Sequence, residues 1–128
     1  MPEKWNDAIK KFSEDTIRAY GISPWNIQLM LYKLTNAFKE KSTYKILKYS
    51  AEIGHYISDA HVPLHATENY NGQFTNQKGI HGFWESRVPE LFFQDYNLFT
   101  GKAVYIDQPL KETWRFIKES YFAVDSVL

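Results

Sequence analysis

The chain contains no cysteine, so disulfide bonds and metal sites built from thiolates are impossible. Neither sign of charge predominates, because 15 lysines and arginines balance 15 aspartates and glutamates. A broad basic surface for nucleic acid or anionic lipid is therefore not expected. No run of about 18 apolar residues occurs, which argues against stable membrane insertion. Any bound metal must be held by imidazole and carboxylate groups, a ligand set that suits zinc.

Histidine is absent from most of the chain. All four histidines lie between residues 55 and 81, at His55, His61, His65 and His81. Two are followed four residues later by a carboxylate, which gives the pairs His55–Asp59 and His81–Glu85. Residues four apart share one face of a helix, so each pair predicts two ligands for a metal ion. His65 follows a proline and can complete one of these pairs. This combination favours a metal site over the simpler alternatives of a hydrogen-bonded core histidine or a surface ion pair.

Apolar residues recur at spacings of three and four residues along most of the chain, which predicts an all-α fold. We expect one domain over residues 1–128, a bundle of five or six helices with the metal site between the third and fourth. The expected helices cover residues 2–20, 23–40, 42–61, 80–99 with a turn or bend at Pro89, and 109 onward. Residues 66–79 form a polar loop, and residues 104–106 could be extended.

Three expectations concern packing. Aromatic residues are abundant, with nine Phe, nine Tyr and four Trp, and most are expected in the core. Trp84 in particular is expected to pack inward, away from His81 and Glu85. The small residues Ala51, Gly54 and Ser58 are expected to let a neighbouring helix or a metal cluster approach the third helix closely.

The pattern His-x-x-x-Asp-x-His-x-Pro-Leu-His at residues 55–65, followed after the polar loop by His-x-x-x-Glu at residues 81–85, resembles the zinc-dependent phospholipase C and single-strand-specific nuclease superfamily. Those proteins are all-helical phosphoesterases with up to three zinc ions. The resemblance is strong over residues 55–85 and general elsewhere. It implies hydrolysis of phosphodiester bonds in phospholipid head groups or single-stranded nucleic acid, and export to the periplasm or outside the cell.

The resemblance also implies roles for individual residues. His55 and Asp59 correspond to ligands of a close zinc pair, with Asp59 as the bridging carboxylate. His65, His81 and Glu85 together hold the remaining zinc and leave an open position for water or a phosphate oxygen. Glutamate rather than aspartate at position 85 favours the phospholipase branch of the superfamily.

Two sets of residues in the same region have no ligand role. His61 lies within the motif but is not a ligand in the family, which leaves it a supporting or structural role. In the polar loop, Asn69, Tyr70 and Asn71 are candidates for lining the substrate site. The two asparagines can equally be turn formers.

The chain departs from the family pattern before residue 55. Family members begin with a tryptophan that binds zinc, and further His and Asp ligands follow it. Here no histidine precedes His55, Trp5 is not terminal, and no general base is identified. The last helix lacks a terminating glycine, proline or polar tail, as in a truncated helix. Two interpretations remain open: a central fragment of a longer enzyme, with little activity alone and the rest of its domain as partner, or a non-catalytic relative stabilised by zinc.

Overall fold

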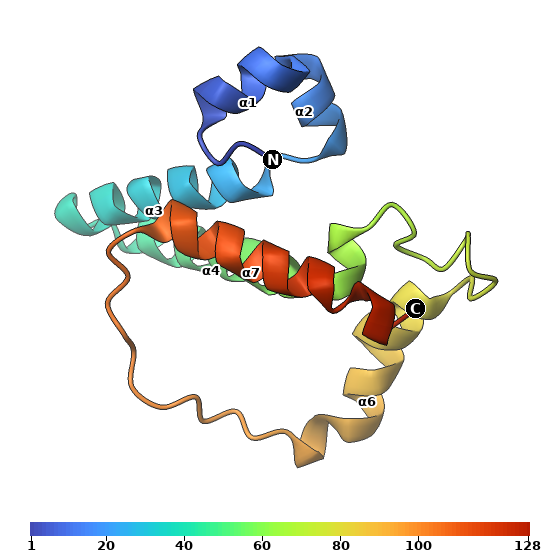
Figure 1. The fold of residues 1–128 in the computed structure, drawn as a ribbon. Helices are drawn as coiled ribbons and strands as arrows, with labels where there is room; N and C mark the ends of the chain where they lie inside the picture. Colours follow the sequence, from blue (N-terminus) through green and yellow to red (C-terminus); the bar gives the residue numbers. More distant parts are fainter.

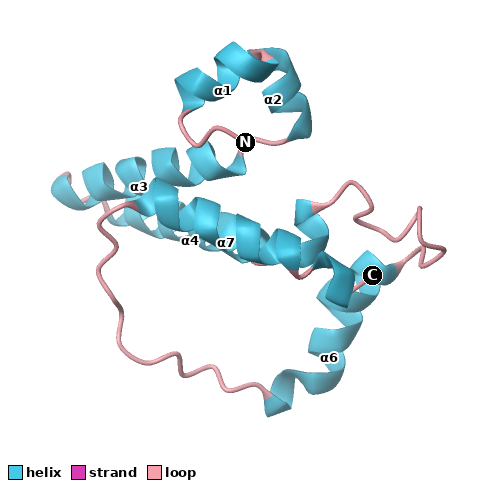
Figure 2. Ribbon diagram, in the orientation of Figure 1, coloured by secondary structure: helices cyan, strands magenta, loops and turns pink.

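The computed structural model describes all residues 1–128 and consists of helices joined by loops, without a β-strand (Figures 1 and 2). The helices are α1 (Trp5–Phe12), α2 (Glu14–Tyr20), α3 (Ser23–Lys39), α4 (Thr43–Ala60), α5 (Ile80–Gly82), α6 (Val88–Phe92) and α7 (Pro109–Phe122). Single turns of 3₁₀ helix cover Pro63–Ala66, Phe93–Asp95 and Val124–Ser126, and a π-helical turn covers Phe83–Arg87. The predicted all-α class is therefore confirmed. None of the helices combines the length and the apolar character that crossing a membrane requires.

The main bundle is formed by α3, α4 and α7 (Figure 1). Helices α3 and α4 form a long hairpin, and α7 packs against both. Its buried centre consists of Ile27, Met30, Ile53 and Ala60. Proline and glycine set the limits of these helices much as predicted: Pro24 lies in the first turn of α3, and Pro63 follows the end of α4.

The prediction of one helix over residues 2–20 is wrong, because this segment forms two helices, α1 and α2. The chain turns sharply at Ser13, whose φ of 64° is incompatible with a continuous helix. The Ser13 side chain accepts a hydrogen bond from the Thr16 backbone N–H at 3.3 Å, which caps α2. The first helix also begins at Trp5, later than predicted from Pro2.

Three tryptophans fasten the N-terminal segment to the bundle. Trp25 and Trp114 both donate their indole N–H to the backbone carbonyl of Glu3, at 2.9 and 3.2 Å. The rings of Trp5 and Trp114 pack edge-on against Trp25, with centroids 5.1 and 5.5 Å away. Residues far apart in sequence are thereby held at one end of the bundle, beside the pocket described below.

A single buried hydrogen bond ties α7 to the end of α4. The Ser120 hydroxyl donates to the Ala60 carbonyl at 2.8 Å. We expect Ser120→Ala to lower the free energy of unfolding by about 1–3 kcal/mol, because it leaves a buried carbonyl without its donor. Urea titration followed by circular dichroism measures this loss. Ser42→Ala is the matched control: Ser42 makes no side-chain capping bond, so its stability should hardly change. Equal stability of the two variants would contradict the role given to Ser120.

The predicted helix over residues 80–99 is shorter and less regular than expected. Pro89 has no N–H to offer the carbonyl of Glu85, and the preceding turn is π-helical, with the Val88 N–H donating to the Phe83 carbonyl five residues back. Helical structure ends with the 3₁₀ turn at Asp95, and the chain then runs irregularly to Gln108. Residues 104–106 pair with no strand. Pro89 therefore interrupts the helix as predicted, but the later apolar pattern does not continue it.

The expectations about aromatic packing are wrong for most of the chain. Trp114 is buried, but most other aromatic side chains are exposed, and Trp84 is 39% exposed. For the exposed aromatic residues from Phe83 to Tyr105, the physical reason is visible in Figure 1, where α6 and the segment that follows it stand away from the α3–α4–α7 bundle. The close approach expected at Gly54 is also missing, since an added Cβ there would meet nothing within 4 Å.

Candidate metal centre

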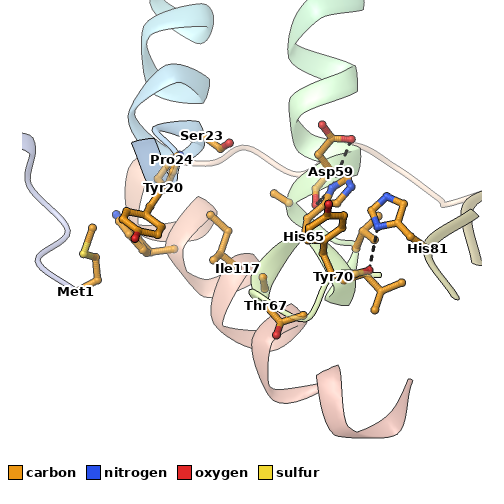
Figure 3. A pocket seen from close by; sticks show the side chains of 16 residues that line it. Met1, Tyr20, Ser23, Pro24, Asp59, His65, Thr67, Tyr70, His81 and Ile117 are labelled. Atoms are coloured by element: carbon orange, nitrogen blue, oxygen red, sulfur yellow. Dashed lines mark hydrogen bonds and ion pairs between the residues drawn. The ribbon is translucent and has the colours of Figure 1, made fainter. Parts of the chain in front are cut away.

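The end of α4 places His65 beside the following helices. After Ala60 the chain leaves the helix, and Pro63 starts a 3₁₀ turn in which Leu64 is completely buried. This turn packs against α7. The neighbouring His65 lies beside Asp59 of α4 and His81 of α5 (Figure 3).

Three of the predicted ligands come together. The Nε2 atom of His65 lies 3.0 Å from one carboxylate oxygen of Glu85, and the Nε2 atom of His81 lies 3.0 Å from the other. One ligand atom from each of the three residues falls within 4.8 Å of the others, so the group could hold a metal ion. We call His65, His81 and Glu85 the triad. It lies between the turn after α4 and the α5–π segment, close to the position predicted from the sequence.

The two imidazoles are oriented by backbone carbonyls. His81 Nδ1 lies 3.1 Å from the carbonyl oxygen of Tyr70, and His65 Nδ1 lies 3.2 Å from that of Asp59. A carbonyl can only accept a hydrogen bond, so each Nδ1 carries the proton. In a neutral imidazole the Nε2 atom then has a free lone pair, and both lone pairs are directed at Glu85. This is the arrangement by which metal-bound histidines are usually fixed.

A cation explains the contacts of Glu85. A carboxylate and two unprotonated nitrogens are all acceptors, and they repel one another at 3.0 Å unless a positive charge lies among them. Either a proton on each ring or one shared metal ion supplies that charge. In a tetrahedral zinc site with bonds of about 2.0–2.1 Å, neighbouring ligand atoms are about 3.3 Å apart. The two observed 3.0 Å separations run to different oxygens of Glu85, and one donor atom from each residue lies within 4.8 Å of the others, so the group could hold a metal ion.

The first predicted pair is formed but stays outside the triad. His55 Nε2 lies 3.4 Å from Asp59 Oδ2, and the His55 side chain is 71% exposed. The other oxygen of Asp59 lies 3.8 Å from Nδ1 of His65, so Asp59 lies between His55 and the triad. His61 joins neither group: its Nδ1 hydrogen-bonds the Ile57 carbonyl at 2.7 Å, which closes the end of α4.

The loop before α5 is held together by its own asparagines. The Asn69 side-chain oxygen accepts the Phe74 N–H at 2.8 Å, and that of Asn71 accepts the Gly79 N–H at 3.1 Å. These bonds give both asparagines a turn-forming role, which was one of the two alternatives from the sequence. Tyr70, between them, lines the pocket and meets His81 edge-on at 5.8 Å.

A pocket of about 610 Å³ adjoins the triad (Figure 3). Asp59, His65 and His81 line it together with apolar residues that include Trp114 and Ile117. No lysine or arginine lines this pocket. Trp114 and Ile117 could not be predicted as part of this pocket, because α7 lies far from residues 55–85 in the chain. The Tyr70 and Asp59 carbonyls were likewise missed, since the backbone path of a loop cannot be derived from side-chain spacing.

Gly72 tests whether the loop positions the triad. Its φ is 69°, and an added Cβ would lie 2.5 Å from the Gln77 carbonyl oxygen, so Gly72→Ala must move the loop. We expect zinc affinity to fall about 10–100-fold, because the Tyr70 carbonyl no longer holds His81. Competition with a coloured chelator measures the change. Gly101→Ala is the control, since Gly101 also has a positive φ but open space around it. A similar affinity in both variants would show that the loop does not orient His81.

No family model, curated protein or solved structure matches this chain. The capacity of the triad to hold a metal ion therefore rests on its geometry and donor chemistry. The resemblance of residues 55–85 to the phospholipase C and nuclease superfamily stays a prediction from the sequence.

Proposed function

We propose that the chain binds one zinc ion through His65, His81 and Glu85, and that this site belongs to a zinc-dependent hydrolase of phosphodiester bonds. The observation that carries the proposal is the orientation of the two imidazoles: each is fixed through Nδ1 by a carbonyl and directs Nε2 at the same carboxylate. Nitrogen and oxygen donors without thiolate favour zinc and hydrolytic chemistry.

Three protein donors leave a fourth position of a tetrahedral zinc free. A zinc ion with a free position polarises a phosphoryl oxygen or activates a water molecule. The pocket beside the triad offers no lysine or arginine to a phosphate group, so neutralisation of its charge falls to the metal. Its apolar lining, which includes Trp114 and Ile117, suits an uncharged part of the ester, whether a phospholipid or a nucleotide base.

The pair His55–Asp59 supplies part of a second metal site, as an enzyme with a zinc cluster requires. The 3.4 Å contact between His55 and Asp59 supports their assignment as ligands of the close zinc pair, separate from the ion held by the triad. Two side chains are too few for a second site, so in this proposal further donors come from outside the chain, for instance from the remainder of a larger domain. The chain alone is then expected to bind one zinc ion firmly and to hydrolyse phosphodiesters weakly.

A structural zinc site is the second candidate, and one observation favours it. The segment after Phe83 has few packing partners in the bundle, whereas Glu85 lies 3.0 Å from His65 of the turn after α4. A metal held there fastens this segment to the bundle. Such a site needs no free coordination position and no substrate.

The two candidates are distinguished by the coordination of the metal. Protein stripped with a chelator and reloaded is expected to hold one zinc ion per chain by elemental analysis, and absence of zinc would refute both candidates. In the cobalt-loaded protein, an open position predicts that dimethyl phosphate reaches the metal, which broadens its ³¹P resonance. A closed structural site predicts an unbroadened resonance together with a chelator-sensitive melting temperature. Weak hydrolysis of bis(p-nitrophenyl) phosphate that depends on zinc would support the hydrolase directly.

A further inference from the structure

The pocket beside the triad contains one carboxylate that no lysine or arginine neutralises. Asp59 lines this pocket together with His65 and His81. Its two oxygens contact only imidazole nitrogens, Nε2 of His55 at 3.4 Å and Nδ1 of His65 at 3.8 Å. Met1, with its amino group, also lines the pocket but lies on the side away from Asp59 (Figure 3). The negative charge of Asp59 is therefore left without a cationic side chain.

Asp59 is close enough to the triad for its charge to act there. Its carboxylate contacts Nδ1 of His65, whereas Nε2 on the other side of the same ring is a donor of the triad. Little more than one imidazole ring thus separates the carboxylate from a metal ion at the triad. This distance is shorter than the Debye length of about 10 Å at 0.1 M salt. The Asp59 side chain is 35% exposed, so water and salt screen its charge only in part.

The formal charges around the pocket cancel when the triad holds one zinc ion. Zinc brings two positive charges, and Glu85 of the triad and Asp59 of the pocket each bring one negative charge. Histidines that bind a metal through Nε2 are neutral. A phosphodiester is an anion and therefore meets a site without net positive charge. An uncharged ester of similar shape is not affected by this balance.

We propose that Asp59 is a specificity-determining residue of this pocket: it weakens the binding of anionic phosphodiesters at the triad and shifts selectivity toward uncharged phosphate esters. The inference rests on the proposed function, in which Asp59 belongs to a second metal site that this chain does not complete. A chain that holds zinc only at the triad leaves the charge of Asp59 uncompensated. This gives an electrostatic reason for weak hydrolysis of phosphodiesters by the chain alone.

Binding of two phosphate esters to the cobalt-loaded chain tests the inference. Dimethyl phosphate is an anion, whereas trimethyl phosphate is uncharged and otherwise similar. The affinity of each ester follows from the broadening of its ³¹P resonance at pH 8, where an unperturbed imidazole is neutral. We expect Asp59→Asn to raise the affinity for dimethyl phosphate about threefold to tenfold and to leave that for trimethyl phosphate unchanged. The gain should shrink in 1 M salt, where the Debye length is about 3 Å.

Two further variants separate the charge of Asp59 from its shape. Asp59→Glu keeps the charge and is expected to keep the wild-type ratio of the two affinities. Asp95→Asn removes an exposed aspartate that does not line the pocket, so it should leave the ratio unchanged as well. Elemental analysis is expected to give one cobalt ion per chain in every protein, because none of these substitutions changes the triad.

The possible results distinguish this inference from the proposed function. An unchanged ratio in Asp59→Asn would overturn the inference and leave the metal site standing. An equal gain for both esters would overturn it too, since Asp59 would then obstruct the pocket by its shape. Loss of cobalt from Asp59→Asn would identify Asp59 as a ligand of the triad's metal, which contradicts the inference. A wild-type chain that holds no cobalt, or whose cobalt broadens neither resonance, would refute the hydrolase proposal and this inference together.

Discussion

Replacing Glu85 by glutamine is expected to weaken zinc binding by about a hundredfold or more. Both oxygens of this carboxylate contact an imidazole nitrogen at 3.0 Å, so the substitution removes the charge that both sides of the triad share. Loss of a residue that only orients a ligand typically costs 10–100-fold in metal affinity, and the loss of a ligand should exceed this range. The amide keeps the shape of the side chain and cannot replace the charge.

Glu90→Gln is the matched control for this prediction. Glu90 lies on the same segment and is exposed, and its side chain contacts only Arg87, at 3.4 Å. Free zinc at 100 times its Kd stabilises the folded chain by about 2.7 kcal/mol, which for a chain of this length corresponds to roughly 10 °C in Tm. The wild-type protein and Glu90→Gln should show this rise, and Glu85→Gln should not. An equal rise in all three proteins would exclude Glu85 as a ligand.

The triad could be predicted from the sequence because two of its three ligands lie close together in the chain. His81 and Glu85 are four residues apart, and one helical turn is enough to bring them together. His65 needed more, since its contact with Glu85 joins segments twenty residues apart. Its place just after Pro63 and the family-like pattern around it both pointed to His65. The carbonyls that orient both rings could not be predicted, because they depend on the path of the loop through Tyr70.

The helices could be predicted where proline and glycine interrupt the apolar pattern, as at Pro24 and Pro63. The break at Ser13 was missed although the sequence carries a signal for it. A serine followed by two acidic residues is typical of a helix start, and Ser13 does cap α2. The exposure of the aromatic residues from Phe83 onward was missed for a different reason. Apolar spacing predicts which face of a helix requires a partner, but not whether the same chain supplies one.

Replacing Leu64 by alanine is expected to have the largest effect on stability. Leu64 is fully buried in the turn that precedes His65, and this turn packs against α7. Removing most of a buried leucine side chain typically costs about 2–5 kcal/mol. Domains of this size are stable by about 5–15 kcal/mol, so the variant loses a large fraction of the total. Urea denaturation of the zinc-free protein measures the loss.

The same substitution separates the stability of the fold from the chemistry of the site. Leu64→Ala changes no metal ligand, so zinc should still bind the folded molecules and restore part of the lost stability by mass action. Its apparent zinc affinity should fall only by the fraction of molecules that are unfolded. Leu29→Ala, at a half-exposed position on α3, is the control and should change stability by less than about 1 kcal/mol. If Leu64→Ala were as stable as Leu29→Ala, the turn before His65 would not be anchored by this side chain.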